Sequence, residues 1–95
     1  MNEMGRLHVR VAGRVQGVGF RWFIREEARR LRLAGWVRNL VSGEIEFVAE
    51  GPPEAIDELA KAVAKGPPGA RVEVVHRLPD EHETEQLPSP FTIER

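Results

Sequence analysis

The chain has 95 residues, of which 41% are hydrophobic and 31% charged, as in a single globular domain over residues 1–95. Its formal net charge of −1 argues against a surface built as a whole for nucleic acid or anionic lipid, and the absence of cysteine excludes disulfides and cysteine chemistry. No apolar run is long enough for a signal sequence or a membrane span, so we expect a cytoplasmic protein.

The first half of the chain predicts a strand, a helix and a hairpin. Residues 7–11 alternate between apolar and polar types, which predicts a strand with one buried face and with His8 and Arg10 pointing outward. After a glycine-rich segment, apolar residues recur at helical spacing over residues 20–31. The Ser42-Gly43 pair then predicts a tight turn between two strands, residues 36–40 and 44–50.

The second half completes the pattern with a helix and a sheet edge. A helix is predicted to begin at Pro52-Pro53 and to end before the Gly-Pro-Pro-Gly run of residues 66–69. Residues 71–78 predict a fourth strand, residues 79–90 a polar, acidic loop, and residues 91–93 a short last strand that continues the sheet or adds an edge.

The order β-α-β-β-α-β predicts an α+β fold of the ferredoxin-like type. In that sandwich two helices pack on one face of an antiparallel sheet. Many unrelated activities use this architecture, so the function must be argued from the site.

The strongest indication of a site is the segment GRVQGVGFR, residues 13–21. Its three glycines allow the backbone to curl tightly into the start of a helix. Such a turn directs several N–H groups toward one point, which suits a bound phosphate. Neither the Walker A pattern nor the dinucleotide fingerprint is present, which disfavours a nucleotide. An ordinary strand-to-helix turn is the alternative interpretation of the glycines alone.

Arg21 favours the phosphate interpretation. It falls in the first turn of the predicted helix, where a cation faces the positive end of the helix dipole at a cost of roughly 0.3–1 kcal/mol. A residue that breaks a local rule in this way often belongs to a functional site. A dianion bound between the loop and the guanidinium would offset the cost. The alternative is an exposed arginine that pairs with Glu26 or Glu27.

Two separated motifs resemble those of the acylphosphatases, a family of small hydrolases of carboxyl phosphates. The first is the segment of residues 13–21, and the second is GWVRNLVSGEI, residues 35–45, followed by Gly51. Two positions depart from the residues most usual in the family: Ser42 stands in place of aspartate, and Ile45 in place of valine. Both lie in or after the hairpin turn, away from the expected chemistry. The β-α-β-β-α-β order extends the resemblance over nearly the whole chain.

The resemblance implies which residues form the site. The backbone of residues 15–20 and the side chain of Arg21 are expected to hold the phosphate, and Asn39 is expected to hold the attacking water. The implied phosphate-binding residues are Val15, Gln16, Gly17, Val18, Gly19, Phe20 and Arg21, and the implied catalytic residues are Arg21 and Asn39. Taken without the motif, Asn39 has a second interpretation as a local turn former beside the hairpin. The implied substrate is a small acyl phosphate, and inorganic phosphate is the product and an expected inhibitor.

The motifs contain no residue placed as a general base, a general acid or a metal ligand. An acyl phosphate can be hydrolysed without such residues, because its carboxylate leaving group is stable without protonation. Catalysis can then consist of positioning and charge stabilisation. We therefore expect a metal-independent hydrolase without a cofactor. The three histidines, His8, His76 and His82, share no close spacing that favours a metal site.

A non-catalytic anion- or RNA-binding module is the alternative hypothesis. A basic stripe follows the first predicted helix and consists of Arg21, Arg25, Arg29 and Arg32. Glu26 and Glu27 dilute this stripe, and no aromatic run of the RNA-recognition type is present. We therefore predict no nucleic-acid partner. We also expect no membrane association and a monomer.

Overall fold

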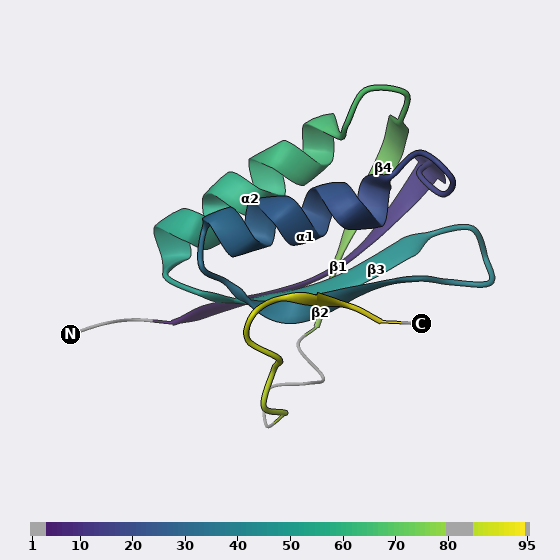
Figure 1. The fold of residues 1–95 in the computed structure, drawn as a ribbon. Helices are drawn as coiled ribbons and strands as arrows, with labels where there is room; N and C mark the ends of the chain where they lie inside the picture. Colours follow the sequence, from purple (N-terminus) through teal and green to yellow (C-terminus); the bar gives the residue numbers. More distant parts are fainter. Residues whose placement is uncertain (1–3, 80–84, 95) are drawn as a thin grey trace.

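The computed structural model describes residues 4–79 and 85–94. The elements follow in the order β1 (Gly5–Arg14), α1 (Phe20–Arg30), β2 (Ala34–Asn39), β3 (Ile45–Gly51), α2 (Pro53–Lys65), β4 (Arg71–Leu78) and β5 (Thr92–Ile93). Both helices lie on one face of the sheet, and the loop after β1 lies at the same end of the molecule as the β2–β3 hairpin (Figure 1). The predicted order of strands and helices is confirmed.

The sheet has five strands in the order β4-β1-β3-β2-β5. The first four pair antiparallel, as the sequence predicts. The last strand runs parallel to β2, with Trp36 opposite Thr92 and Val37 opposite Ile93. It is therefore an additional edge strand, and it makes the sheet mixed rather than wholly antiparallel.

The hydrophobic core fills the layer between the helices and the sheet. Each helix buries one stripe of apolar side chains: Phe20, Ile24 and Ala28 from α1, and Ile56, Leu59 and Val63 from α2. These stripes face the alternate apolar residues of the central strands, which are Leu7, Val9, Val11, Ile45, Phe47 and Ala49. Burial of each large apolar side chain contributes roughly 1.5–3 kcal/mol, so this layer supplies the main driving force for folding.

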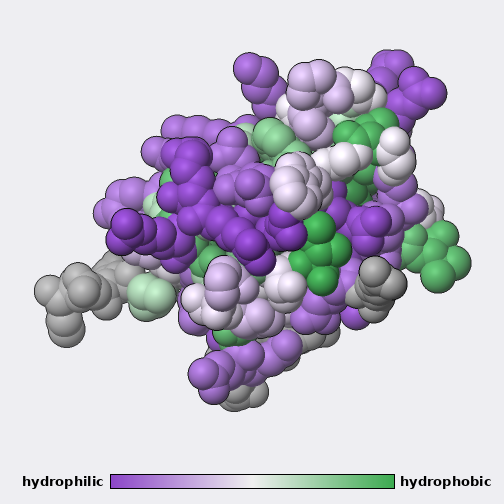
Figure 2. Space-filling model, viewed as in Figure 1, coloured by the Kyte–Doolittle hydropathy of each residue, from purple (hydrophilic) through white to green (hydrophobic). Residues whose placement is uncertain are grey.

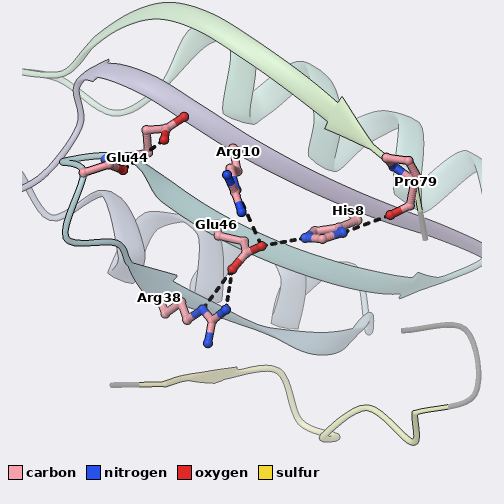
Figure 3. Close-up of polar contacts among 7 residues, drawn as sticks. His8, Arg10, Arg38, Glu44, Glu46 and Pro79 are labelled. Carbon is pink, nitrogen blue, oxygen red and sulfur yellow. Dashed lines mark hydrogen bonds and ion pairs between the residues drawn. The ribbon is translucent and has the colours of Figure 1, made fainter. Parts of the chain in front are cut away.

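The helix-free face of the sheet is more buried than the strand pattern predicts. The pattern expects His8 to point outward from β1, and the side chain does face away from the helices, yet it is buried there together with Glu46 of β3. His8 Nε2 lies 2.7 Å from Glu46 Oε2, and Arg38 donates two hydrogen bonds to Glu46 Oε1 at 2.9 and 2.7 Å (Figure 3). The expectation of a single buried face is therefore wrong at this point of the sheet.

Glu46 is stabilised in its ionised form by these neighbours. Burial raises the pKa of the Glu46 carboxyl, but hydrogen bonds from His8 and Arg38 and their positive charge outweigh burial and hold the pKa below its ordinary value of 4.5. Arg10 adds a further cation 3.8 Å from the same carboxylate. Glu46 thus forms the centre of a charged cluster that joins β1, β2 and β3.

Part of the segment predicted as a solvated loop, residues 79–90, packs on the same face. Leu87 is buried and contacts Trp36, and the carbonyl oxygen of Pro88 accepts a hydrogen bond of 2.8 Å from the backbone of β2. The remainder of the predicted loop, residues 80–84, lies outside the described residues. The polar composition of the segment concealed this contact, because a single leucine, Leu87, makes it.

The face of the molecule seen in Figure 2 is mostly hydrophilic, with hydrophobic residues in separate groups. Trp22 is the largest of the exposed apolar side chains in the described residues, with 57% of its surface accessible. None of the helices among these residues has the length and apolar character that a bilayer span requires.

Candidate active site

The loop between β1 and α1 depends on glycine for its backbone conformation. Gly17 and Gly19 have φ angles of 74° and 75°, in the left-handed region that L-residues avoid. A Cβ atom added at either position would meet no atom within 4 Å, so backbone conformation and not space requires glycine there. Gly19 is the N-cap residue of α1, and the chain turns sharply from the loop into the helix.

This turn leaves the N-terminus of α1 without its usual partners. Gly19 provides no side-chain cap, and the first turn of α1 contains no acidic residue. Within the described chain, the backbone N–H groups of residues 17–22 donate no hydrogen bond of ordinary geometry to a protein acceptor. Unpaired N–H groups and the positive end of the helix dipole together favour an anion at this position.

Arg21 is half-buried in the first turn of α1. It has no ion pair or hydrogen bond with another described residue. The two glutamates considered as its alternative partners bind other arginines: Glu26 lies 3.3 Å from Arg25, and Glu27 lies 2.9 Å from Arg30. The guanidinium of Arg21 is therefore available to a ligand.

A pocket of about 560 Å³ brings the two sequence motifs together. The predicted residues that line it are Val15, Gly17, Gly19, Phe20 and Arg21 from the first motif, and Asn39 from the second. The structure thus places the two predicted catalytic residues on one cavity, although a helix and most of a strand separate them along the chain.

Asn39 is the last residue of β2 and pairs with Ile45 across the sheet. Its Oδ1 atom is buried and has no hydrogen-bond partner in the described chain. Backbone bonds close the hairpin without this side chain: the N–H of Leu40 donates to the carbonyl of Glu44 at 2.8 Å, and the N–H of Gly43 donates to the carbonyl of Leu40 at 3.0 Å. Asn39 is therefore not a turn former, and its amide needs a partner from elsewhere.

Gln16 and Val18 do not line the pocket. The side chain of Gln16 instead donates hydrogen bonds from Nε2 to the carbonyl oxygens of Leu40 at 2.8 Å and Glu44 at 2.9 Å. Val18 is half-buried and packs against the hydrophobic core. The two side chains hold the loop in place, one against the hairpin and one against the core.

Three residues that the sequence did not indicate also line the pocket: Trp22, Ile93 and Glu94. The backbone N–H of Glu94 donates to the carbonyl of Val37 at 2.8 Å, which fixes the end of β5 beside β2. This parallel pairing leaves no local signal in the sequence. Trp22 could have been suspected, because it directly follows Arg21 in the helical pattern.

Members of the basic stripe make contacts within the protein. The Arg25 guanidinium stacks on the Trp22 ring, with its central carbon 3.8 Å from the ring centroid, and Arg29 Nε donates to the carbonyl of Phe91 at 2.8 Å. Over the described ranges, no group of three or more His, Cys, Asp or Glu side chains is arranged to hold a metal ion. His82 lies outside those ranges.

Comparisons with known proteins show the family to which this ferredoxin-like domain belongs. Residues 7–93 match the sequence model of the acylphosphatase family. The chain is 55% identical to an acylphosphatase of Thermococcus kodakarensis over 67 residues, which are 70% of this chain and 74% of that protein. It is 48% identical to an acylphosphatase of Bacillus velezensis over 80 residues, 79% of this chain and 89% of that protein.

Solved structures agree with this assignment. The crystal structure of acylphosphatase from Bacillus subtilis resembles this structure with a TM-score of 0.84 at 36% identity, over 98% of this chain and 100% of that one. An acylphosphatase from Coxiella burnetii gives a TM-score of 0.83 at 37% identity, over 98% of this chain and 94% of that one. The chain belongs to the acylphosphatase family. The family resemblance, the ferredoxin-like fold and the prediction of an acylphosphatase-type hydrolase are confirmed.

Proposed function

We propose that this protein hydrolyses the carboxyl–phosphate bond of acyl phosphates to a carboxylate and inorganic phosphate. The backbone of residues 15–20 and the guanidinium of Arg21 bind the phosphoryl group, and Asn39 holds the attacking water. One observation carries this proposal: the Arg21 guanidinium and the Asn39 amide oxygen, both without a partner among the described residues, belong to residues lining one pocket at the N-terminus of α1.

Phosphate binding follows from the charges around the loop. The N–H groups of residues 17–22 and the dipole of α1 provide partial positive charge, and Arg21 adds a full charge and a fork of donors that matches phosphate oxygens. A dianion bound there would offset the electrostatic cost of placing the Arg21 cation at the positive end of the helix dipole. The loop, the helix dipole and Arg21 together favour a bound anion.

The hydrolytic step needs little beyond correct positioning. The oxygen of the water attacks phosphorus in line with the bond to the acyl oxygen; that bond breaks, and its electron pair leaves with the carboxylate. The water proton passes to a phosphoryl oxygen, which becomes part of the phosphate product. A hydrogen bond from the water to Asn39 would give the buried Oδ1 a partner and place the nucleophile.

The leaving group defines the substrate class. A carboxylate leaves without protonation, so the reaction needs no general acid, and charge stabilisation by loop and arginine is sufficient. The alkoxide of a phosphate monoester would need an acid or a metal ion, so we expect monoesters to be poor substrates. We propose that a monomer carries out the reaction in the cytoplasm without cofactor, metal, membrane or nucleic acid.

Hydrolysis of benzoyl phosphate in water enriched in oxygen-18 tests this function. Attack at phosphorus places the label in inorganic phosphate and leaves benzoate unlabelled. A reaction without enzyme, run in parallel, gives the background. Label in benzoate would show attack at the carbonyl carbon and overturn the proposed step, and absence of turnover would overturn the function.

A further inference from the structure

Trp22 is exposed at the site in a way that packing does not explain. Its side chain lines the pocket beside Arg21, yet 57% of its surface is accessible. The other tryptophan of the chain, Trp36, is 4% exposed and is covered by Leu87. Aromatic side chains that line a pocket commonly contact the ligand that it binds.

The Trp22 ring is held in position by its neighbours. The guanidinium of Arg25 stacks on the ring at 3.8 Å, and only 21% of the Arg25 side chain is exposed. Glu26 lies 3.3 Å from Arg25 and balances its charge. The stacked guanidinium therefore orders the indole, and Glu26 limits the positive charge that Arg25 adds beside the pocket.

The pocket is larger than the phosphoryl group requires. A phosphate ion has five heavy atoms, and even a whole water's share of liquid volume for each, about 30 Å³, gives an upper limit of about 150 Å³. The pocket measures about 560 Å³. The remaining space lies within a cavity that Trp22 and Ile93 line with apolar surface, and the acyl group of a bound substrate must occupy or border it.

From these observations we infer that Trp22 is a specificity-determining residue: its indole stacks against the acyl group, so the enzyme prefers flat aromatic acyl phosphates to short aliphatic ones. The inference rests on the proposed function and adds the acyl half of the substrate to it. Stacking of two aromatic rings is strong enough to change affinity by about tenfold.

Binding of two phosphonates that cannot be hydrolysed tests the inference without relying on turnover. 2-Phenylethylphosphonate matches benzoyl phosphate in length, and propylphosphonate matches acetyl phosphate. Calorimetry gives the ratio of their dissociation constants for the wild type and for Trp22→Leu, Trp22→Phe and Val74→Ala. Val74 is an exposed apolar residue of β4 that does not line the pocket, so its variant is the matched control.

We expect the wild type and Val74→Ala to bind the phenyl compound about tenfold more tightly, Trp22→Leu to lose most of this preference, and Trp22→Phe to keep it. The same ratio is then measured as kcat/KM for benzoyl phosphate against acetyl phosphate, with the change expected in KM. An unchanged phenyl preference in Trp22→Leu would overturn the inference. A preference that depends on Trp22, with no hydrolysis of either acyl phosphate, would instead overturn the proposed function and leave the aromatic subsite in place.

Discussion

Gln16 donates a hydrogen bond of 2.8 Å from its side-chain amide to the carbonyl oxygen of Leu40, and so fixes the loop that precedes Arg21 to the hairpin turn that follows Asn39. The same amide also donates to the carbonyl of Glu44 at 2.9 Å. The two halves of the proposed site come from separate elements, so their relative position depends on contacts of this kind. Gln16 therefore acts as a positioning residue, through a side chain that does not line the pocket.

We expect Gln16→Ala to reduce stability by about 1–2 kcal/mol, because two partly buried hydrogen bonds between the loop and the hairpin are lost. Displacement of the loop should also lower kcat/KM for benzoyl phosphate by about 10- to 100-fold. Urea unfolding and steady-state kinetics measure the two effects. Gln86→Ala, at an exposed position, is the control and should change neither. Wild-type kinetics in Gln16→Ala would show that the backbone alone holds the loop.

Arg21→Gln should abolish phosphate binding and lower the rate by at least about 100-fold, because the main charge opposite the phosphoryl group is lost. Stability in phosphate-free buffer should be unchanged or higher by about 0.3–1 kcal/mol, since a cation is removed from the positive end of α1. Calorimetry with phosphate and thermal unfolding check both statements. Arg77→Gln, on the exposed edge strand, is the matched control. An unfolded Arg21→Gln protein would make the arginine structural.

Glu94 brings a negative charge to the pocket in which we place a dianion. Replacement by glutamine should therefore tighten inhibition by inorganic phosphate about two- to fivefold at low ionic strength, and less at high salt. Inhibition constants from benzoyl phosphate kinetics give the comparison, and Glu54→Gln on α2 provides a distant control of the same charge change. Equal inhibition constants at low salt would mean that this carboxylate does not act on the bound phosphate.

The Glu46 cluster predicts a pH-dependent contribution to stability. Burial opposes ionisation of Glu46, but His8 and Arg38 lower its folded-state pKa below the ordinary value of 4.5. The stabilisation is therefore complete above about pH 4.5 and is lost as the pH falls through the lower, folded-state pKa. Glu46→Gln should cost about 1.5–3 kcal/mol at neutral pH, and its difference from the wild type should shrink in acid.

Urea unfolding from about pH 7 down to about pH 3 measures this difference, with Glu73→Gln on the exposed edge strand as control. A stability difference between wild type and Glu46→Gln that stays constant over this range would contradict the role of the ionised carboxylate.

The sequence predicted what local patterns encode. Helical spacing identified the buried stripe of α1, and the Ser42-Gly43 pair identified the hairpin. Contacts that arise from the pairing of distant strands were not predicted. The strand alternation could not reveal that His8 meets Glu46 on the helix-free face, since neither residue has a local reason to be buried.

In the candidate site, too, local motifs were predicted and long-range contacts were not. The motif that ends at Arg21 and the one that contains Asn39 could be recognised from residue types, and the structure brings both residues to one pocket. Glu94 was missed because it reaches the pocket only through the parallel pairing of β5 with β2. The role of Gln16 as a tether was missed because its side chain binds backbone carbonyls, which carry no sequence signal.

Hydrolysis of benzoyl phosphate in the presence of EDTA, by the wild type and Asn39→Ala side by side, tests the central claim most directly. We predict chelator-resistant turnover that phosphate inhibits, a kcat lowered by about 100-fold or more in Asn39→Ala, and an inhibition constant for phosphate that stays close to that of the wild type. An Asn39→Ala enzyme with normal kcat and weakened phosphate binding would contradict the account.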